Sequence, residues 1–144
     1  MENPEYSYIT IFGQMGDRNA DKAVGSHFVG LTKLLDQYCN RPYCRDVDQI
    51  VVAFRVDGDL WSFEFEGCEK LRLSKKNRYI SIDVGMPRAK WENIEKKIIK
   101  TYVISNLRKA LELSINRLKK EKYVVDEEKL WNDFKQVETK FLSP

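Results

Sequence analysis

Hydrophobic residues recur with helical spacing in the first third of the chain. Intervals of four, three, four and three residues separate the members of one apolar stripe: Val24, Phe28, Leu31, Leu35 and Tyr38. This period predicts an amphipathic helix over residues 21–39. Asp21 stands just before the stripe, where an aspartate side chain can cap the first turn of a helix.

Two further helical patterns fill the C-terminal part of the chain. The first begins after Arg88, and its apolar stripe contains Trp91, Ile94, Ile98, Tyr102, Leu107, Leu111, Ile115 and Leu118. Because this stripe is longer than most globular helices, we expect a kink near residues 101–106, where β-branched residues cluster. A final helix is predicted to begin at Asp126, with an apolar side formed by Leu130, Phe134, Val137 and Phe141.

Residues 50–65 alternate with the period of a strand on both sides of Asp57-Gly58. Asp-Gly favours a two-residue turn, so the pattern predicts an antiparallel hairpin in which Val56 lies opposite Asp59. Large apolar side chains then share one face: Ile50, Val52, Phe54, Trp61, Phe63 and Phe65. Small and charged side chains share the other: Val51, Ala53, Arg55, Ser62, Glu64 and Glu66.

A second hairpin is predicted around the turn KKNR, residues 75–78. Leu71 and Leu73 would meet Ile80 and Ile82, and the opposite face would carry Arg72, Ser81 and Asp83. A strand at residues 5–13 completes the order β-α-β-β-β-β-α-α. We therefore expect an α+β fold, a mostly antiparallel sheet of roughly five strands with about three helices packed on one face.

The length of 144 residues suits one domain with its own core, and no linker or repeat interrupts it, so we expect a single α+β domain over residues 1–144. The N-terminus has no signal-peptide pattern, and no apolar run reaches the roughly 20 residues of a membrane span. Three cysteines in such a chain indicate free thiols. These features predict a cytoplasmic protein that makes no membrane contact.

The net charge of +3 is distributed unevenly. Residues 1–86 carry 11 basic and 13 acidic side chains, whereas residues 87–144 carry 14 and 9. The lysine-rich flanks EKKIIK and NRLKKEKY leave a nucleic-acid-associated module open as the alternative function. Aromatic residues are not interleaved with these basic residues as in RNA-binding motifs, so a nucleic-acid partner is not the first expectation.

Residue types that carry chemistry are scattered. The single histidine, His27, lies three helical turns from Cys39, beyond the reach that a Cys–His nucleophile requires. Cys39 and Cys44 form a Cys-x4-Cys pair without a second pair of zinc ligands, so no metal is expected. The loop from Gly13 to Gly16 lacks the full phosphate-binding motifs and indicates no cofactor, although a small nucleotide-handling enzyme stays open.

Acidic side chains gather around the first predicted hairpin: Asp46, Asp48, Asp57, Asp59, Glu64 and Glu66. The sequence pattern indicates no apolar pocket around them, so the pKa shifts that an acid/base pair needs are not predicted. They form either a solvated sheet face or an acidic docking surface for a basic partner.

The stretch YISIDVGMPRAKWE, residues 79–92, followed by a long amphipathic helix, resembles cytoplasmic immunity proteins of bacterial polymorphic-toxin and contact-dependent growth inhibition systems. The DGDLWSFEF hairpin and the closing KLWNDFKQVETKFL helix add to this resemblance. It implies a protein that is not an enzyme and that binds a cognate toxin domain tightly. The common acidity of such proteins is only partly met, since the net charge is +3.

Under this hypothesis the toxin docks on the polar sheet face and the hairpin rim. The predicted partner-binding residues are Arg55, Asp57, Asp59, Glu64, Glu66, Tyr79, Asp83 and Arg88. Gly85 and Pro87 break the strand pattern between them, and no nucleophile follows the glycine. We therefore interpret this junction as a joint between sheet and helix rather than a catalytic elbow.

Overall fold

The computed structural model describes residues 8–14, 18–56, 67–86 and 96–143. Along the chain the elements are β1 (Ile9–Gln14), α1 (Arg18–Tyr38), β2 (Gln49–Val56), β3 (Gly67–Ser74), β4 (Tyr79–Met86), α3 (Lys96–Lys120) and α4 (Glu127–Leu142). Helices and one sheet are both present, which confirms the predicted α+β class. Within the described ranges, no helix is long and apolar enough to cross a membrane.

The four described strands form a mixed sheet in the order β1-β2-β4-β3. β2 runs parallel to both β1 and β4, and only β3 and β4 pair antiparallel. The prediction of a mostly antiparallel sheet is therefore wrong for the described strands, which number four rather than the predicted five or so. α1 forms a crossover between β1 and β2, which returns the chain to the starting end of the sheet and makes these strands parallel.

β2 is a central strand, and this position overturns the predicted register of the first hairpin. Val52 pairs with Ile11 on one edge and with Ile82 on the other, so both edges of β2 are occupied. The strand predicted at residues 59–65 lies outside the described residues. An Asp-Gly turn signal is local, whereas the pairing of a buried strand depends on partners far away in the sequence.

The second predicted hairpin is confirmed. β3 pairs with β4 so that Leu73 lies opposite Ile80 and Arg72 lies opposite Ser81. The register shifts between Glu69 and Arg72, and within this bulge Lys70 has a φ of 53°. Charged side chains and a bulge both discourage another strand from adding to an exposed edge such as that of β3.

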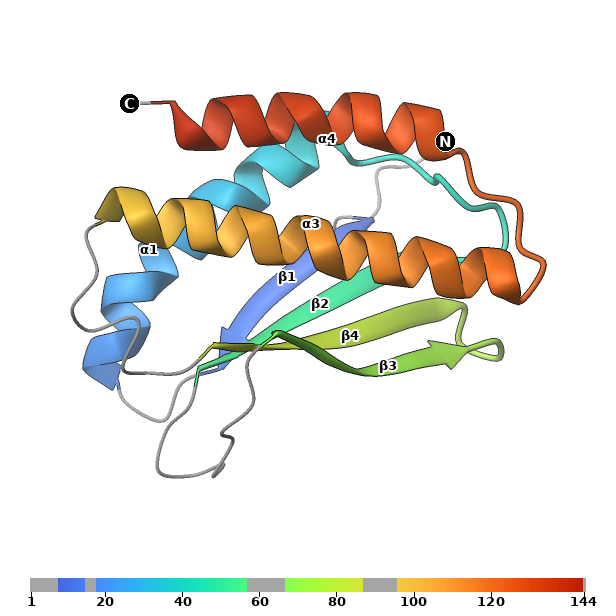
Figure 1. The fold of residues 1–144 in the computed structure, drawn as a ribbon, viewed down its shortest axis with the longest axis horizontal. Coiled ribbons are helices and arrows are strands. Elements are labelled where there is room, and N and C mark those ends of the chain that lie inside the picture. Colours follow the sequence, from blue (N-terminus) through green and yellow to red (C-terminus); the bar gives the residue numbers. More distant parts are fainter. Residues whose placement is uncertain (1–7, 15–17, 57–66, 87–95, 144) are drawn as a thin grey trace.

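All three described helices lie on one face of the sheet (Figure 1). α1 and α3 pack directly on the strands, and α4 lies over these two helices, away from the sheet. The core joins Phe54 to Phe28 of α1, whose rings lie 5.1 Å apart, and includes Leu107 of α3. The predicted stripes on α1 and α4 face this core wherever their side chains are described.

Helix boundaries depart from the predictions in two places. α1 begins at Arg18, so Asp21 lies inside the helix and is not its N-cap. α3 continues through residues 101–106 without a break. Val103 and Ile104 are 0% and 2% exposed, and burying such side chains contributes more than their small helix-propensity cost.

The predicted start of the last helix is confirmed. Asp126 is the N-cap of α4, and its Oδ1 accepts a hydrogen bond from the backbone N–H of Lys129 over 3.2 Å. This bond satisfies one of the backbone donors that the first turn of a helix leaves unpaired.

Candidate partner-binding surface

The sheet face opposite the three described helices is called the open face below. Strand register assigns it Thr10, Val51, Tyr79, Ser81, Glu69 and Arg72, since Thr10 pairs with Val51, Val51 with Ser81, and Ser81 with Arg72. Glu69 and Arg72 on the edge strand are exposed, and the other four are half-buried. Polar and aromatic side chains on the inner strands of the sheet, among them Tyr79 and Ser81 of β4, are therefore partly accessible.

This accessibility is unusual for the strand arrangement. Parallel strands are normally covered on both faces, whereas antiparallel sheets often leave one face in water. β1, β2 and β4 are parallel neighbours, yet the described helices cover only the face of Ile50 and Ile80. A half-buried face on parallel strands fits a surface that a second molecule completes.

Burial changes along the open face. Near the start of β2 and β4, Tyr79 is half-buried, and Gln49 Nε2 donates to Thr10 Oγ1 over 2.6 Å. Towards the ends of the same strands, Ala53 and Asp83 are only 4% and 3% exposed. The accessible part of the open face is therefore centred on Tyr79, Val51 and Ser81.

The structure places some of the predicted partner-binding residues on this face. Tyr79 is partly accessible there, and Asp83 lies on the same face with its side chain buried. Arg55 belongs to β2, where it pairs with Gln14 and Gly85. The remaining predicted residues lie outside the described ones: Asp57, Asp59, Glu64, Glu66 and Arg88.

Sequence reasoning placed Val51 on the polar sheet face but missed Thr10 and Gln49 as its neighbours there. Their period-two positions indicate which strand face they share. That β1 and β4 flank β2 follows from tertiary pairing, which no local pattern shows.

Three connections meet at the Tyr79 end of the sheet: residues 39–48, the β3–β4 turn and residues 121–126. Arg78 Nη2 donates to the carbonyl of Arg45 over 2.9 Å, and the N–H of Asp48 donates to the carbonyl of Arg78 over 2.7 Å. Cys44 forms a β-bridge with Val125. These bonds hold the three connections together as one end of the molecule.

Buried tyrosines fix the first of these connections in place. The Cys44 N–H donates to the Tyr8 hydroxyl over 3.2 Å, and the rings of Tyr8 and Tyr43 meet edge to face at 5.7 Å. Burial raises the pKa of the Cys39 thiol from 9.0 to about 12. A thiol with so high a pKa is a poor nucleophile, so Cys39 has a packing role here.

A groove of about 270 Å³ lies between α3 and α4 and is lined by Arg108, Glu112, Ile115, Asn116, Glu127 and Trp131. The Arg108 guanidinium lies 5.0 Å from the centre of the Trp131 ring. Arg108 also forms ion pairs with Glu112 and Glu138. Its charge is thus satisfied within the protein, which weakens the case for this groove as a binding site.

The described part of the chain contains no cluster of three or more histidine, cysteine, aspartate or glutamate side chains that could hold a metal ion. The described residues thus belong to a small α+β protein, and its candidate site is the partly accessible sheet face rather than a metal centre. The family model Immunity protein 44 matches residues 8–140, and the chain belongs to this family. The match confirms the resemblance to immunity proteins of toxin systems. Comparison with curated proteins gives no match, and neither does comparison with solved structures.

Proposed function

We propose that this protein neutralises a cognate toxin domain by binding it tightly, without catalysis, and that the toxin docks on the open face. Membership of an immunity-protein family supports toxin neutralisation in general. The observation that carries the choice of surface is the half-buried face of parallel strands around Tyr79.

The composition of this face fits a protein partner. Tyrosine and arginine are enriched among the residues that dominate binding energy, and the open face presents Tyr79 and Arg72. Ser81 and Thr10 add hydroxyl groups that can exchange hydrogen bonds with a partner. In this proposal, Tyr79 anchors the complex and the polar side chains around it determine register.

The acidic residues predicted at positions 57, 59, 64 and 66 remain part of the proposal. They would contribute a charged border to the docking surface if the partner presents basic side chains there. Reversing their four charges together would then weaken binding while leaving the fold intact. An unchanged affinity would remove them from the docking surface.

The function is tested by affinity capture of partners from the native cell, with the intact chain as bait. We expect one dominant partner in stoichiometric amount. Expression of that partner alone should arrest growth, and co-expression of this chain should restore it. A partner that is harmless, or whose toxicity persists on co-expression, would contradict the proposed function.

A control separates specific neutralisation from a general effect of overexpression. Leu113 is exposed on α3, and α3 packs on the sheet face opposite the open face. A Leu113→Ala chain should therefore protect cells as well as the wild type does. Protection by an unrelated α+β protein expressed to the same level would indicate a non-specific effect.

A further inference from the structure

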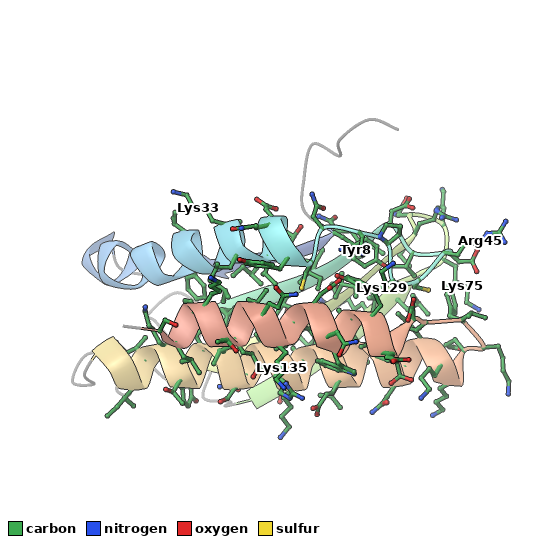
Figure 2. All side chains as sticks on the ribbon, turned by 90° about the horizontal axis from the view of Figure 1, so that it is seen from above. Tyr8, Lys33, Arg45, Lys75, Lys129 and Lys135 are labelled. Atoms are coloured by element: carbon green, nitrogen blue, oxygen red, sulfur yellow. The ribbon has the colours of Figure 1, made fainter. Side chains whose placement is uncertain are left out.

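A group of exposed basic side chains, called the basic rim below, surrounds the end of the sheet where the three connections meet. It consists of Arg45, Lys75, Lys76, Arg78, Lys120 and Lys122. Figure 2 shows Arg45 and Lys75 close together at this end, and Figure 1 places the C-terminal end of α3 and the β3–β4 turn there as well. These residues come from three separate parts of the sequence.

Most of the rim's charge is not neutralised within the described ranges. Asp48 pairs with Arg78 at 3.0 Å, and Glu127 and Glu121 pair with Lys119 and Arg117. The other rim members form no ion pair within the described residues: Arg45, Lys75, Lys76, Lys120 and Lys122. The six basic rim residues outnumber the carboxylates that lie among them, Asp46, Asp48 and Glu121, so the rim keeps an excess of positive charge.

The basic rim is continuous with the open face. Tyr79 pairs with Ser74 and with Gln49, directly before the β3–β4 turn and directly after Asp48. Hydrogen bonds between Asp48 and Arg78 close the remaining gap. A molecule that covers Tyr79 would therefore also lie against the rim.

We propose that the basic rim binds an acidic surface of the toxin domain and steers that surface onto the open face. This inference rests on the proposed function and specifies the chemistry of the partner. Opposite charges around a docking site raise the association rate more than they raise the final affinity. The steering would therefore act mainly on the encounter step.

A protein partner fits the rim better than nucleic acid does. Asp46, Asp48 and Glu121 lie among the basic residues and would repel phosphates along a continuous backbone. Nucleic-acid sites rely instead on uninterrupted positive charge, often with exposed aromatic side chains on which bases stack. Mixed charge with a basic excess is complementary to an acidic protein surface.

The test compares two triple variants that change the net charge equally. Arg45→Glu/Lys75→Glu/Lys76→Glu reverses charge on the rim. Lys33→Glu/Lys135→Glu/Lys140→Glu reverses it on α1 and α4, where Figure 2 shows Lys33 and Lys135 away from the rim. The measurement is the association rate constant with the purified captured partner at about 0.01 M and about 0.15 M ionic strength.

The rim variant should associate at least about tenfold more slowly than the wild type at low ionic strength and should lose most of its salt dependence. The control should stay within about threefold of the wild type. Thermal unfolding checks that both variants fold. If the rim variant unfolds, Lys75→Gln/Lys76→Gln replaces it, with a smaller expected fall in the same direction.

Equal rates for the two triple variants would overturn the inference, whether both fall or neither does. If random-sequence duplex DNA displaces the partner from the wild-type chain, the inference is overturned in favour of a nucleic-acid site. If the partner binds and is neutralised but the rim variant behaves like the wild type, only the rim inference fails. If no neutralised partner exists, the proposed function fails and the inference falls with it.

Discussion

The hydroxyl of Tyr43 donates a hydrogen bond to Asp133 Oδ2 over 2.6 Å, which joins the connection between α1 and β2 to α4. Arg41 Nε lies 3.2 Å from the same oxygen. Because hydrogen bonds to a charged group contribute about 1.5–3 kcal/mol and Arg41 still pairs with Asp133, Tyr43→Phe should lower the free energy of unfolding by about 1–2 kcal/mol. Chemical denaturation measures this change.

Tyr123→Phe is the matched control. It removes a half-buried tyrosine hydroxyl that makes no hydrogen bond among the described residues, and it should change the free energy of unfolding by less than about 0.5 kcal/mol.

Stability should decrease at alkaline pH because the fold buries groups that must stay protonated. Burial raises the pKa of Cys39 from 9.0 to about 12, and it raises those of Tyr8 and Tyr43 above their ordinary value of 10.0. The unfolded chain therefore releases these protons at lower pH than the folded chain does. Stability is complete below about pH 9 and is lost progressively as the pH rises towards about 12.

Urea denaturation between about pH 7 and about pH 11 measures this dependence. Cys39→Ala removes one of the three groups, so its stability should fall less steeply with pH than that of the wild type. A free energy of unfolding that stays constant up to about pH 11 would show that these groups titrate alike in both states.

Two leucines of α4 allow the same substitution to be compared in the core and at the surface. Leu130 is fully buried, whereas Leu142 is 43% exposed. Leu130→Ala should lower the free energy of unfolding by about 2–5 kcal/mol through lost burial and the remaining cavity. Leu142→Ala should lower it by less than about 1 kcal/mol. Similar losses for both variants would mean that α4 does not pack through its predicted stripe.

The N-cap of α4 gives a smaller effect. Asp126→Ala removes the acceptor for the Lys129 N–H and should reduce stability by about 0.5–2 kcal/mol. Asp126→Asn keeps a side-chain oxygen at the same place and should retain most of the stability. If alanine and asparagine reduced the melting temperature equally, the loss would come from the carboxylate charge and not from the hydrogen bond.

The helices were predictable where their apolar residues form one stripe that the fold buries. Leu31 and Leu35 in α1, and Phe134 and Val137 in α4, are buried as their spacing predicts. Each stripe contains enough apolar surface to determine the orientation of its helix locally. The start of α1 was predicted wrongly at Asp21, because a helix cap depends on one or two side chains and gives a much weaker signal than an apolar stripe.

The sheet was less predictable because its pairing is decided by contacts far apart in the sequence. β4 lies between β2 and β3, so Val52 meets Ile82 and not a neighbour across the Asp57-Gly58 turn. Period-two alternation correctly placed Tyr79 and Asp83 on the sheet face opposite that of Ile80 and Ile82. It carries no information about what covers a face, which is why the burial of Asp83 was not foreseen.

The basic rim was also not predictable from the sequence, because its members come together through contacts between distant segments. The runs KKNR and NRLKKEKY are visible in the sequence, but Arg45 stands alone there. Tertiary contacts bring the three segments to one end of the molecule, among them the hydrogen bonds of Arg78, the Cys44–Val125 bridge and the bond from the Asp126 N–H to the Tyr43 carbonyl.

The central claim, that a toxin domain docks on the open face, is tested most directly by the dissociation constant of the captured partner. The comparison uses two double variants, Arg72→Ala/Tyr79→Ala on the open face and Leu113→Ala/Lys135→Ala on helices α3 and α4, which lie on the opposite side of the sheet. The first should raise the Kd by about 30-fold or more, the equivalent of about 2 kcal/mol for a binding hot spot, while the second changes it by less than about threefold. An Arg72→Ala/Tyr79→Ala protein that folds and binds with the wild-type Kd would place the docking surface elsewhere.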